Sequence, residues 1–165
     1  IKNQAMKIQV GIITVSDRAS TGEYEDLGGP VLKEAADGYG WAVVAEALVA
    51  DDKEQIQRAI REQIAKGAHL VLTTGGTGVA PRDLTPEAVR EIADRELPGF
   101  GEVMRIESMK ITKNAILSRN LAAAVGNALV ICLPGKPKGA VECLGFVEGA
   151  IPHCVEVLAG VPTSC

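Results

Sequence analysis

The sequence predicts an α/β protein with three layers, α/β/α, around a mostly parallel central sheet. Short apolar runs alternate with segments of helical pattern along the whole chain, as in folds whose parallel strands are joined by helices. Residues 8–15 are almost continuously apolar, which is typical of a strand buried on both faces. Residues 51–66 repeat apolar side chains at helical spacing and are followed by Gly67, a common helix terminator.

Four segments are predicted as strands, at 8–15, 41–49, 70–73 and 127–133. Each is a short run rich in Val, Ile, Leu or Ala, and polar or glycine-rich residues follow it. The pattern between residues 108 and 120 indicates neither a helix nor a strand.

The predicted helices cover 30–36, 51–66, 85–96, 101–107 and 140–150, and a short last helix ends at 158 after Pro152 interrupts the pattern. Pro30 suits the first turn of its helix. For the helix from 85 we expect Thr85 to be the cap, with Pro86 at the first helical position. The sequence Leu-Pro-Gly at 97–99 is expected to break the chain.

Length and composition place the chain among ordinary globular proteins. Its 165 residues predict a single domain over 6–165, in which Met6 is the expected natural start and residues 1–5 are a remnant. Apolar residues make up 47% and charged residues 23%, so the chain can form a core without disulfide bonds. The net charge of −4 and the 3% aromatic content argue against a nucleic-acid partner.

No apolar run approaches the roughly 18 residues of a membrane span, and no signal peptide is evident, so we expect a cytoplasmic protein without membrane attachment. The four cysteines lack the Cys-x-x-Cys spacing of a zinc or redox site. They are expected to be inert, mostly buried thiols in a reducing compartment.

Four polar loops leave the carboxyl ends of the predicted strands, at 16–22, 50–52, 74–83 and 134–139. In open α/β sheets, ligands bind outside these strand ends. We therefore expect the four loops to meet at one crevice. Ser16 opens the first loop and is a candidate ligand-binding hydroxyl.

The loop at 74–83 is the strongest candidate for anion binding. It begins with Thr74, Gly75, Gly76, Thr77 and Gly78, whose small side chains let backbone N–H groups approach a phosphate. It is neither a dinucleotide fingerprint, which needs a third spaced glycine, nor a Walker loop, which needs Gly-Lys-Ser/Thr. The alternative is a purely structural strand-to-helix turn.

Two aspartates in these loops are candidate magnesium ligands. Mg²⁺ commonly takes one or two carboxylates together with phosphate oxygens. Asp83 follows Arg82, and the alternative is a turn residue or a solvated ion pair. Asp51 precedes a helix, where either Asp51 with Glu54 or Asp52 with Gln55 matches a capping box. The sequence leaves open which of the two neighbours is the functional carboxylate.

Two further segments are candidates for contact with an anionic ligand. Pro134 and Gly135 begin a Pro/Gly/Lys loop at a helix start, which is either an anion-binding turn or a rigid turn with exposed lysines. The stretch 105–119 carries a local excess of cations and ends in Ser118 and Arg119, although such a run is usually a solvated face. His69 and His153 are expected to be structural, and the sequence holds no nucleophilic triad.

Several of these segments resemble one family closely. Residues 74–78, 81–87 and 133–137 are similar to the signatures of the molybdenum cofactor biosynthesis (molybdopterin-binding) domain. Residues 16–20, 24–26, 28–30, 94–102 and 115–119 narrow the resemblance to its bacterial molybdopterin adenylyltransferase branch, which is similar also to one domain of gephyrin. The resemblance covers about residues 8–144.

The resemblance implies an enzyme of the α/β/α fold, usually a homotrimer, that uses Mg²⁺ to transfer AMP from ATP to the terminal phosphate of molybdopterin and releases pyrophosphate. The adenylylated dithiolene would then pass to a separate metal-insertion enzyme. By motif, Asp83 and Asp51 occupy the family's functional aspartate positions, and Ser118 with Arg119 match a segment associated with pterin binding. A non-catalytic molybdopterin carrier or scaffold of the same fold is the alternative, and the sequence does not distinguish molybdenum from tungsten as the final metal.

Overall fold

The computed structural model describes residues 5–164, so the predicted remnant, apart from Ala5, and Cys165 lie outside the described residues. Its centre is a six-stranded sheet in the order β2-β1-β3-β6-β5-β4. The strands are β1 Gln9–Val15, β2 Ala42–Val49, β3 Leu70–Thr74, β4 Arg95–Glu96, β5 Ala122–Val125 and β6 Ala128–Leu133. The predicted strands are all present, and the sheet is mostly parallel as predicted.

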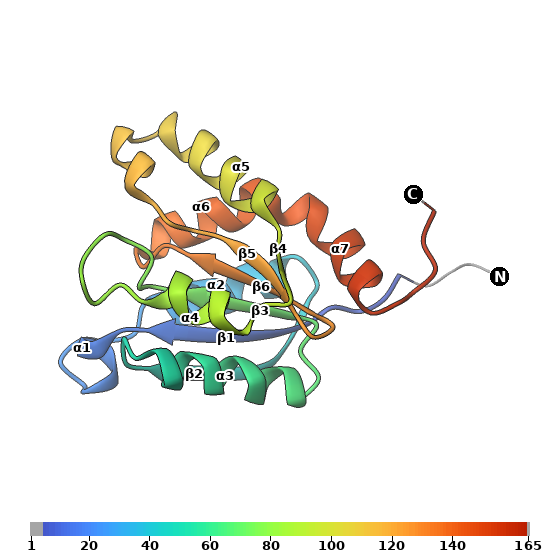
Figure 1. Ribbon diagram of the computed structural model, residues 1–165, viewed down its shortest axis with the longest axis horizontal. Coiled ribbons are helices and arrows are strands. Elements are labelled where there is room, and N and C mark those ends of the chain that lie inside the picture. Colours follow the sequence, from blue (N-terminus) through green and yellow to red (C-terminus); the bar gives the residue numbers. More distant parts are fainter. Residues whose placement is uncertain (1–4, 165) are drawn as a thin grey trace.

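The four parallel strands are neighbours, and the antiparallel strands form one edge. β1 pairs with β2 and β3, and β3 pairs with β6, all in parallel. β5 pairs with both β6 and β4 in antiparallel orientation. The carboxyl ends of β1, β2, β3 and β6 therefore lie together at the left end of the molecule in Figure 1, next to α1 (Asp17–Ser20).

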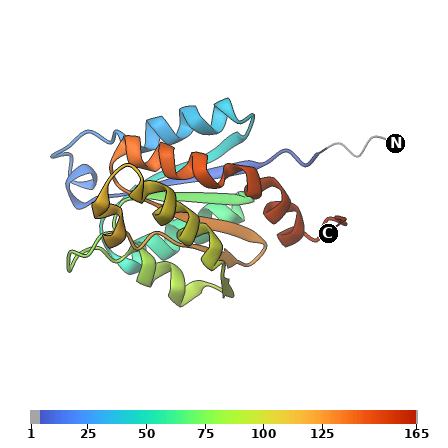
Figure 2. The same ribbon diagram turned by 90° about the horizontal axis from the view of Figure 1, so that it is seen from above.

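Helices cover both faces of the sheet, which gives the predicted three layers (Figures 1 and 2). One face carries α2 Gly28–Gly38, α5 Pro98–Met109, α6 Pro137–Val147 and α7 Ile151–Leu158. The other face carries α3 Lys53–Ala65 and α4 Thr85–Ile92. The 3₁₀ turns η1 (Lys113–Leu117) and η2 (Glu148–Ala150) connect elements at the surface.

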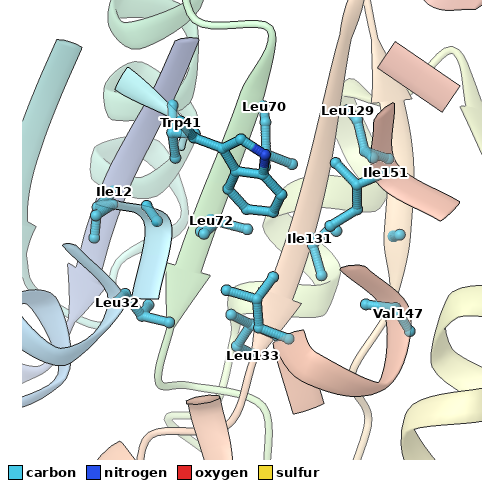
Figure 3. Close-up of a cluster of buried hydrophobic side chains, with 14 of the residues drawn as sticks. Ile12, Leu32, Trp41, Leu70, Leu72, Leu129, Ile131, Leu133, Val147 and Ile151 are labelled. Atoms are coloured by element: carbon cyan, nitrogen blue, oxygen red, sulfur yellow. The ribbon is translucent and has the colours of Figure 1, made fainter. Parts of the chain in front are cut away.

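The larger core lies between the sheet and the four-helix face. Alternate residues of the buried strands, among them Ile12, Leu70 and Leu72, point to this face and pack on Leu32 and Trp41 (Figure 3). The intervening residues of the same strands pack against α3 and α4 on the opposite face. Because both faces are buried, the strands appear in the sequence as continuous apolar runs.

The edge of the sheet is where the sequence prediction is wrong. The helix predicted over 85–96 ends at Ile92, and Arg95 and Glu96 form β4 by pairing with Ala124 and Ala123. β5 was not predicted, because four small residues with no strand alternation carry little local signal. Pairing across the chain overrides the helical propensity of Arg and Glu here.

Several helix boundaries also differ from the prediction. Pro98 begins α5 as its first residue, because a proline lacks only an N–H that the first turn leaves unpaired. A helical turn, α1, follows Ser16, whose Oγ accepts a hydrogen bond from the Ala19 amide at 3.2 Å. Pro152 interrupts the last helical pattern as predicted, since it lies in the first turn of α7.

Candidate functional site

A polar cleft of about 380 Å³ opens at the carboxyl ends of the parallel strands. The structure brings residues from all four predicted loops to it. The predicted site residues that line it are Ser16, Asp51, Thr74, Gly75, Gly76, Asp83 and Gly135. Thr77, Gly78 and Pro134 lie in the same loops but do not line the cleft, and Ser118 and Arg119 line a separate cavity.

Gly75 and Gly76 form the floor of the cleft in a conformation that few other residues adopt. Their φ angles are +103° and +67°, respectively. A Cβ on Gly75 would lie 2.2 Å from the carbonyl oxygen of Val15, and one on Gly76 would lie 2.3 Å from Thr85 Oγ1. The loop therefore runs close to its neighbours, and only glycine fits at both positions.

Hydrogen bonds tie this glycine loop to the other strand-end loops. Thr74 Oγ1 donates to the Pro134 carbonyl at 2.7 Å, and the Gly75 amide donates to the Leu133 carbonyl at 3.2 Å. The expectation that Thr85 caps α4 is wrong. The cap position is Leu84, and the buried Thr85 hydroxyl instead donates to the Gly75 carbonyl at 2.9 Å.

Asp51 and its neighbour Asp52 have different roles in the structure. Asp52 is the N-cap of α3 and accepts the Gln55 amide at 2.9 Å. Asp51 is not the cap of the helix and lies at the cleft. Its Oδ2 accepts a hydrogen bond from the Asp17 amide at 3.0 Å. In return, Asp17 Oδ1 accepts the Asp51 amide at 2.8 Å, so the two loops hold each other.

Asp83 reaches the cleft from the far side of the glycine loop. Its Oδ2 accepts the Ala80 amide at 2.9 Å, and its own amide donates to the Ala80 carbonyl at 2.9 Å. A Cβ on Gly78 would lie 2.8 Å from the same oxygen, so the glycine makes room for the carboxylate. Asp83 is thus a turn residue and a cleft residue at once, because a carboxylate has two oxygens.

The Asp51 carboxyl, at the cleft, has a pKa shifted from its ordinary value. Burial raises its pKa above the ordinary value for aspartate, and the charges on Asp17 and Asp83 raise it further. The Asp17 amide and Arg82 act in the opposite direction but do not cancel the increase. A cation bound beside Asp51 would relieve this repulsion.

Changing Asp17 to Asn should lower the pKa of Asp51 in the metal-free protein. The amide oxygen can still accept the Asp51 N–H, and the Asp17 backbone N–H is unchanged, so only a repelling charge is lost. Carboxyl NMR titration of Asp51 measures the effect directly. A pKa that stays the same or rises would contradict the electrostatic description.

The composition of the cleft suits a cation that takes some of its ligands from the protein and the others from a bound anion. Among residues 5–164, no group of three or more His, Cys, Asp or Glu side chains is arranged to hold a metal. Asp51 and Asp83 could supply two carboxylates, so a hard cation such as Mg²⁺ would need phosphate oxygens and water for the rest. The donor set therefore fits a metal that arrives with a phosphate ligand.

Ser118 and Arg119 lie at a second cavity of about 250 Å³, between α4, α5 and the segment before β5. Arg90, Glu96 and Arg105 also line it; Arg90 forms an ion pair with Glu96, and Arg105 Nη1 donates to the Asn120 carbonyl at 2.7 Å. Asn120 is buried, and its Oδ1 has no hydrogen-bond partner among the described residues. The cavity therefore combines paired charges with one unpaired acceptor, which a hydrogen-bond donor of a ligand could meet.

A family model described as a probable molybdopterin binding domain matches residues 11–153. The chain belongs to the molybdopterin-binding domain family. The match begins in β1, ends in α7, and includes all the loops of the cleft.

Named relatives of the molybdopterin-binding domain family agree with this assignment. The molybdopterin adenylyltransferase of Helicobacter pylori strain J99 is 44% identical over 156 residues, which cover 93% of this chain and 89% of that protein. The molybdopterin adenylyltransferase of Escherichia coli K12 is 38% identical over 174 residues, which cover 93% and 86%. The crystal structure of the molybdopterin biosynthesis enzyme MoaB from Thermus thermophilus has a TM-score of 0.87 and 42% identity, with 95% and 99% covered.

These similarities confirm three predictions made from the sequence. They are the molybdopterin-binding domain family, the α/β fold, and an enzyme of the nucleotidyltransferase class. They do not test the role of any single residue, so the site residues named above stay predictions.

Five charged residues in or beside the cleft of this molybdopterin-binding domain were not predicted as site residues. Arg18, Arg82 and Glu25 line the cleft, so two guanidinium groups lie among its carboxylates. Asp26 accepts hydrogen bonds from Thr14 Oγ1 at 2.9 Å and from the Gly29 amide at 3.0 Å. Asp17 acts through Asp51. All five fall within segments that resemble the family, and that resemblance is the sequence feature from which they could have been predicted.

The cysteines described in the structure lie away from the cleft. Cys132 is fully buried, and burial raises the pKa of its thiol to about 12. Burial also raises the pKa of Cys143 and Cys154. All three are free thiols, as predicted, and none lines either cavity.

In the part of the chain that the structure describes, every helix is too short or too polar to cross a lipid bilayer.

Proposed function

We propose that this enzyme transfers AMP from ATP to the terminal phosphate of molybdopterin. A phosphate oxygen of molybdopterin would attack the α-phosphorus of ATP. The bond from that phosphorus to the oxygen of the β-phosphate would break, and pyrophosphate would leave. The substrates named for the relatives support the choice of acceptor. The convergence of Gly75, Gly76, Asp51, Asp83 and Gly135 on one cleft supports the chemistry.

The main barrier to this reaction is to bring two polyanions together in line, because the phosphates themselves form and break the bonds. The Gly75 amide already donates to the Leu133 carbonyl, so the proposed backbone contact to a phosphate falls to the rest of the glycine loop, where Gly76 leaves the approach free of a side chain. Arg18 and Arg82 add positive charge at the walls of the cleft. No side chain needs to act as a nucleophile.

Asp51 and Asp83 would hold Mg²⁺, which would neutralise phosphate charge when bound. Their carboxylates approach the cleft from different loops, and the pKa of Asp51 is raised first by burial and then by the charges on Asp17 and Asp83, which a bound cation would offset. Asp17 keeps Asp51 in place through the two reciprocal hydrogen bonds. Asp52 is not proposed for this role, because it caps α3 and does not line the cleft.

The cavity beside Ser118 would hold the pterin end of molybdopterin. The unpaired Asn120 Oδ1 could accept a hydrogen bond from a ring N–H. Arg105 could contact a negatively charged group, whereas Arg90 is already paired with Glu96. Arg119, in the wall of this cavity, contacts the loop that carries Asp83, so a ligand that reaches both cavities would place its phosphate near the nucleotide.

The test is an assay of the purified chain with ATP, Mg²⁺ and molybdopterin, in which pyrophosphate and adenylylated molybdopterin are quantified together. Equal amounts of both products are expected. Binding of molybdopterin without either product would instead favour a non-catalytic carrier. Binding of a protein partner with no need for pterin would favour a scaffold.

We also propose that the protein is a homotrimer in the cytoplasm. Large apolar side chains are exposed on α5 and η1, including Val103, Ile106 and Ile116, of which Ile116 is 70% exposed. Val103 also lines an apolar groove of about 470 Å³, together with Leu97, Phe100 and Phe146. Large exposed apolar surface is typical of protein interfaces.

Light scattering coupled to gel filtration is expected to give three times the mass of 17.3 kDa for one chain. Ile106→Asp should shift the population toward the monomer, because it places a charge in the proposed apolar interface. A monomeric unaltered protein at assay concentration would contradict the trimer without affecting the reaction proposed above.

A further inference from the structure

Arg119 lies between the two cavities and contacts three separate parts of the protein. Its Nε donates to the Gly78 carbonyl at 2.7 Å, and its Nη2 donates to the Asp83 carbonyl at 2.6 Å. Its Nη1 forms an ion pair with the carboxylate of Glu87. Its backbone amide donates to the Thr77 carbonyl at 2.9 Å.

These contacts bracket the segment that carries Asp83. Residues 79–82 are exposed, and Val79 is 66% exposed, so packing against the core contributes little to the position of this segment. The carbonyls at its two ends, those of Gly78 and Asp83, are bound by one guanidinium. Hydrogen bonds from a charged donor are roughly twice as strong as neutral ones, so this clamp adds a strong restraint at both ends to the hydrogen bonds between Ala80 and Asp83.

The chemistry of the clamp requires arginine. The acceptors in the clamp are two carbonyls and a carboxylate. A guanidinium can bind all three at once, because it is planar and carries several N–H donors. Glu87 holds the guanidinium from α4, and the hydrogen bond from Arg119 lowers the pKa of that carboxyl below its usual value. A lysine has a single ammonium and cannot reach the three acceptors in this arrangement.

We propose that Arg119 is a positioning residue, which holds the 78–83 segment so that Asp83 faces the cleft, and that it is not primarily a ligand of the substrate. The inference rests on the function proposed above. It differs from the sequence expectation, in which Arg119 shares a substrate-binding role with Ser118. Its three nitrogens already bind protein acceptors.

Steady-state kinetics of Arg119→Lys test the proposal. The expected result is a loss of kcat on the order of 100-fold with the KM for molybdopterin unchanged, because a small displacement of a catalytic group is costly while substrate binding stays intact. Ser118→Ala should do the reverse and raise the KM for molybdopterin. Arg61→Lys, on the exposed side of α3, is the matched control and should behave like the unaltered enzyme.

Chemical rescue separates positioning from a general loss of structure. In Arg119→Ala, added guanidinium chloride at millimolar concentration should restore part of kcat, because the free ion can occupy the vacated place beside the second cavity. The same concentration should leave Ser118→Ala unimproved. An Arg119→Lys enzyme with a raised KM for molybdopterin and an unchanged kcat would overturn the proposal, and Arg119 would then be a substrate ligand.

Amide hydrogen exchange tests the proposed role of Arg119 without any measurement of enzyme activity. The Ala80 amide donates to the Asp83 carboxylate, so it reports whether the segment keeps its shape. Arg119→Lys should accelerate exchange at Ala80 and leave the amides of α3 unchanged. Unaltered exchange at Ala80 would refute the clamp even in an active enzyme. Absence of AMP transfer by the unaltered protein would refute only the proposed function.

Discussion

Replacing Asp51 by asparagine should reduce kcat for AMP transfer by on the order of 10²–10³-fold, the size of effect seen when one electrostatic contact to a transition state is removed. The amide oxygen can keep the hydrogen bond from the Asp17 amide, so the fold of the two loops is retained. What is lost is the negative charge, and an amide NH₂ cannot bind Mg²⁺. Kinetics at several Mg²⁺ concentrations measure the loss and any weakening of metal dependence.

Asp52→Asn is the matched control for this experiment. It makes the same chemical change one residue away, and asparagine caps a helix as well as aspartate does. Activity and stability should therefore stay close to those of the unaltered enzyme. If Asp52→Asn is the inactive variant and Asp51→Asn is active, the assignment of the functional carboxylate is wrong.

Gly75→Ala should lower the free energy of unfolding by about 2–5 kcal/mol, from left-handed backbone strain together with overpacking. The φ of +103° disfavours any side chain, and the added Cβ would lie 2.2 Å from the Val15 carbonyl oxygen. That oxygen belongs to the backbone of β1 and cannot move without disturbing the sheet. Urea denaturation measures the change, and nucleotide binding should weaken with it.

The control for Gly75 is Gly126, in the turn between β5 and β6. Its φ is also positive, at +57°, but a Cβ there would have open space around it. Gly126→Ala should therefore lower the stability by only about 1–2 kcal/mol, the backbone contribution alone. Equal losses at the two positions would contradict the close approach of Gly75 to β1.

The parallel half of the sheet could be predicted from sequence because each strand carries its own signal. Burial on both faces makes β1, β3 and β6 continuous apolar runs. The rule that ligands bind beyond the strand ends then located the cleft with no knowledge of side-chain positions. Gly75, Asp51 and Asp83 meet there for that reason.

The antiparallel edge could not be predicted, because its stability comes from partners distant in the chain. Arg95 and Glu96 have helical propensity, and only pairing with Ala124 and Ala123 makes them a strand. The same limit applies to the contacts of Arg119 with Gly78 and Glu87, which are 41 and 32 residues away. The sequence shows that a residue is an arginine, but it does not show which distant groups will accept its hydrogen bonds.

The burial of the cysteines affects how this protein could handle a sulfur-bearing ligand. If the dithiolene expected on molybdopterin were already oxidised to a disulfide, a nearby thiolate could attack one of its sulfurs, break the S–S bond and hold it as a mixed disulfide, with the other sulfur released as a thiolate. Burial raises the pKa of the Cys132, Cys143 and Cys154 thiols, and none of the three lines either cavity. Within the described residues, the sulfur atoms of a ligand bound in these cavities would therefore have no cysteine thiol in the cavity walls with which to exchange.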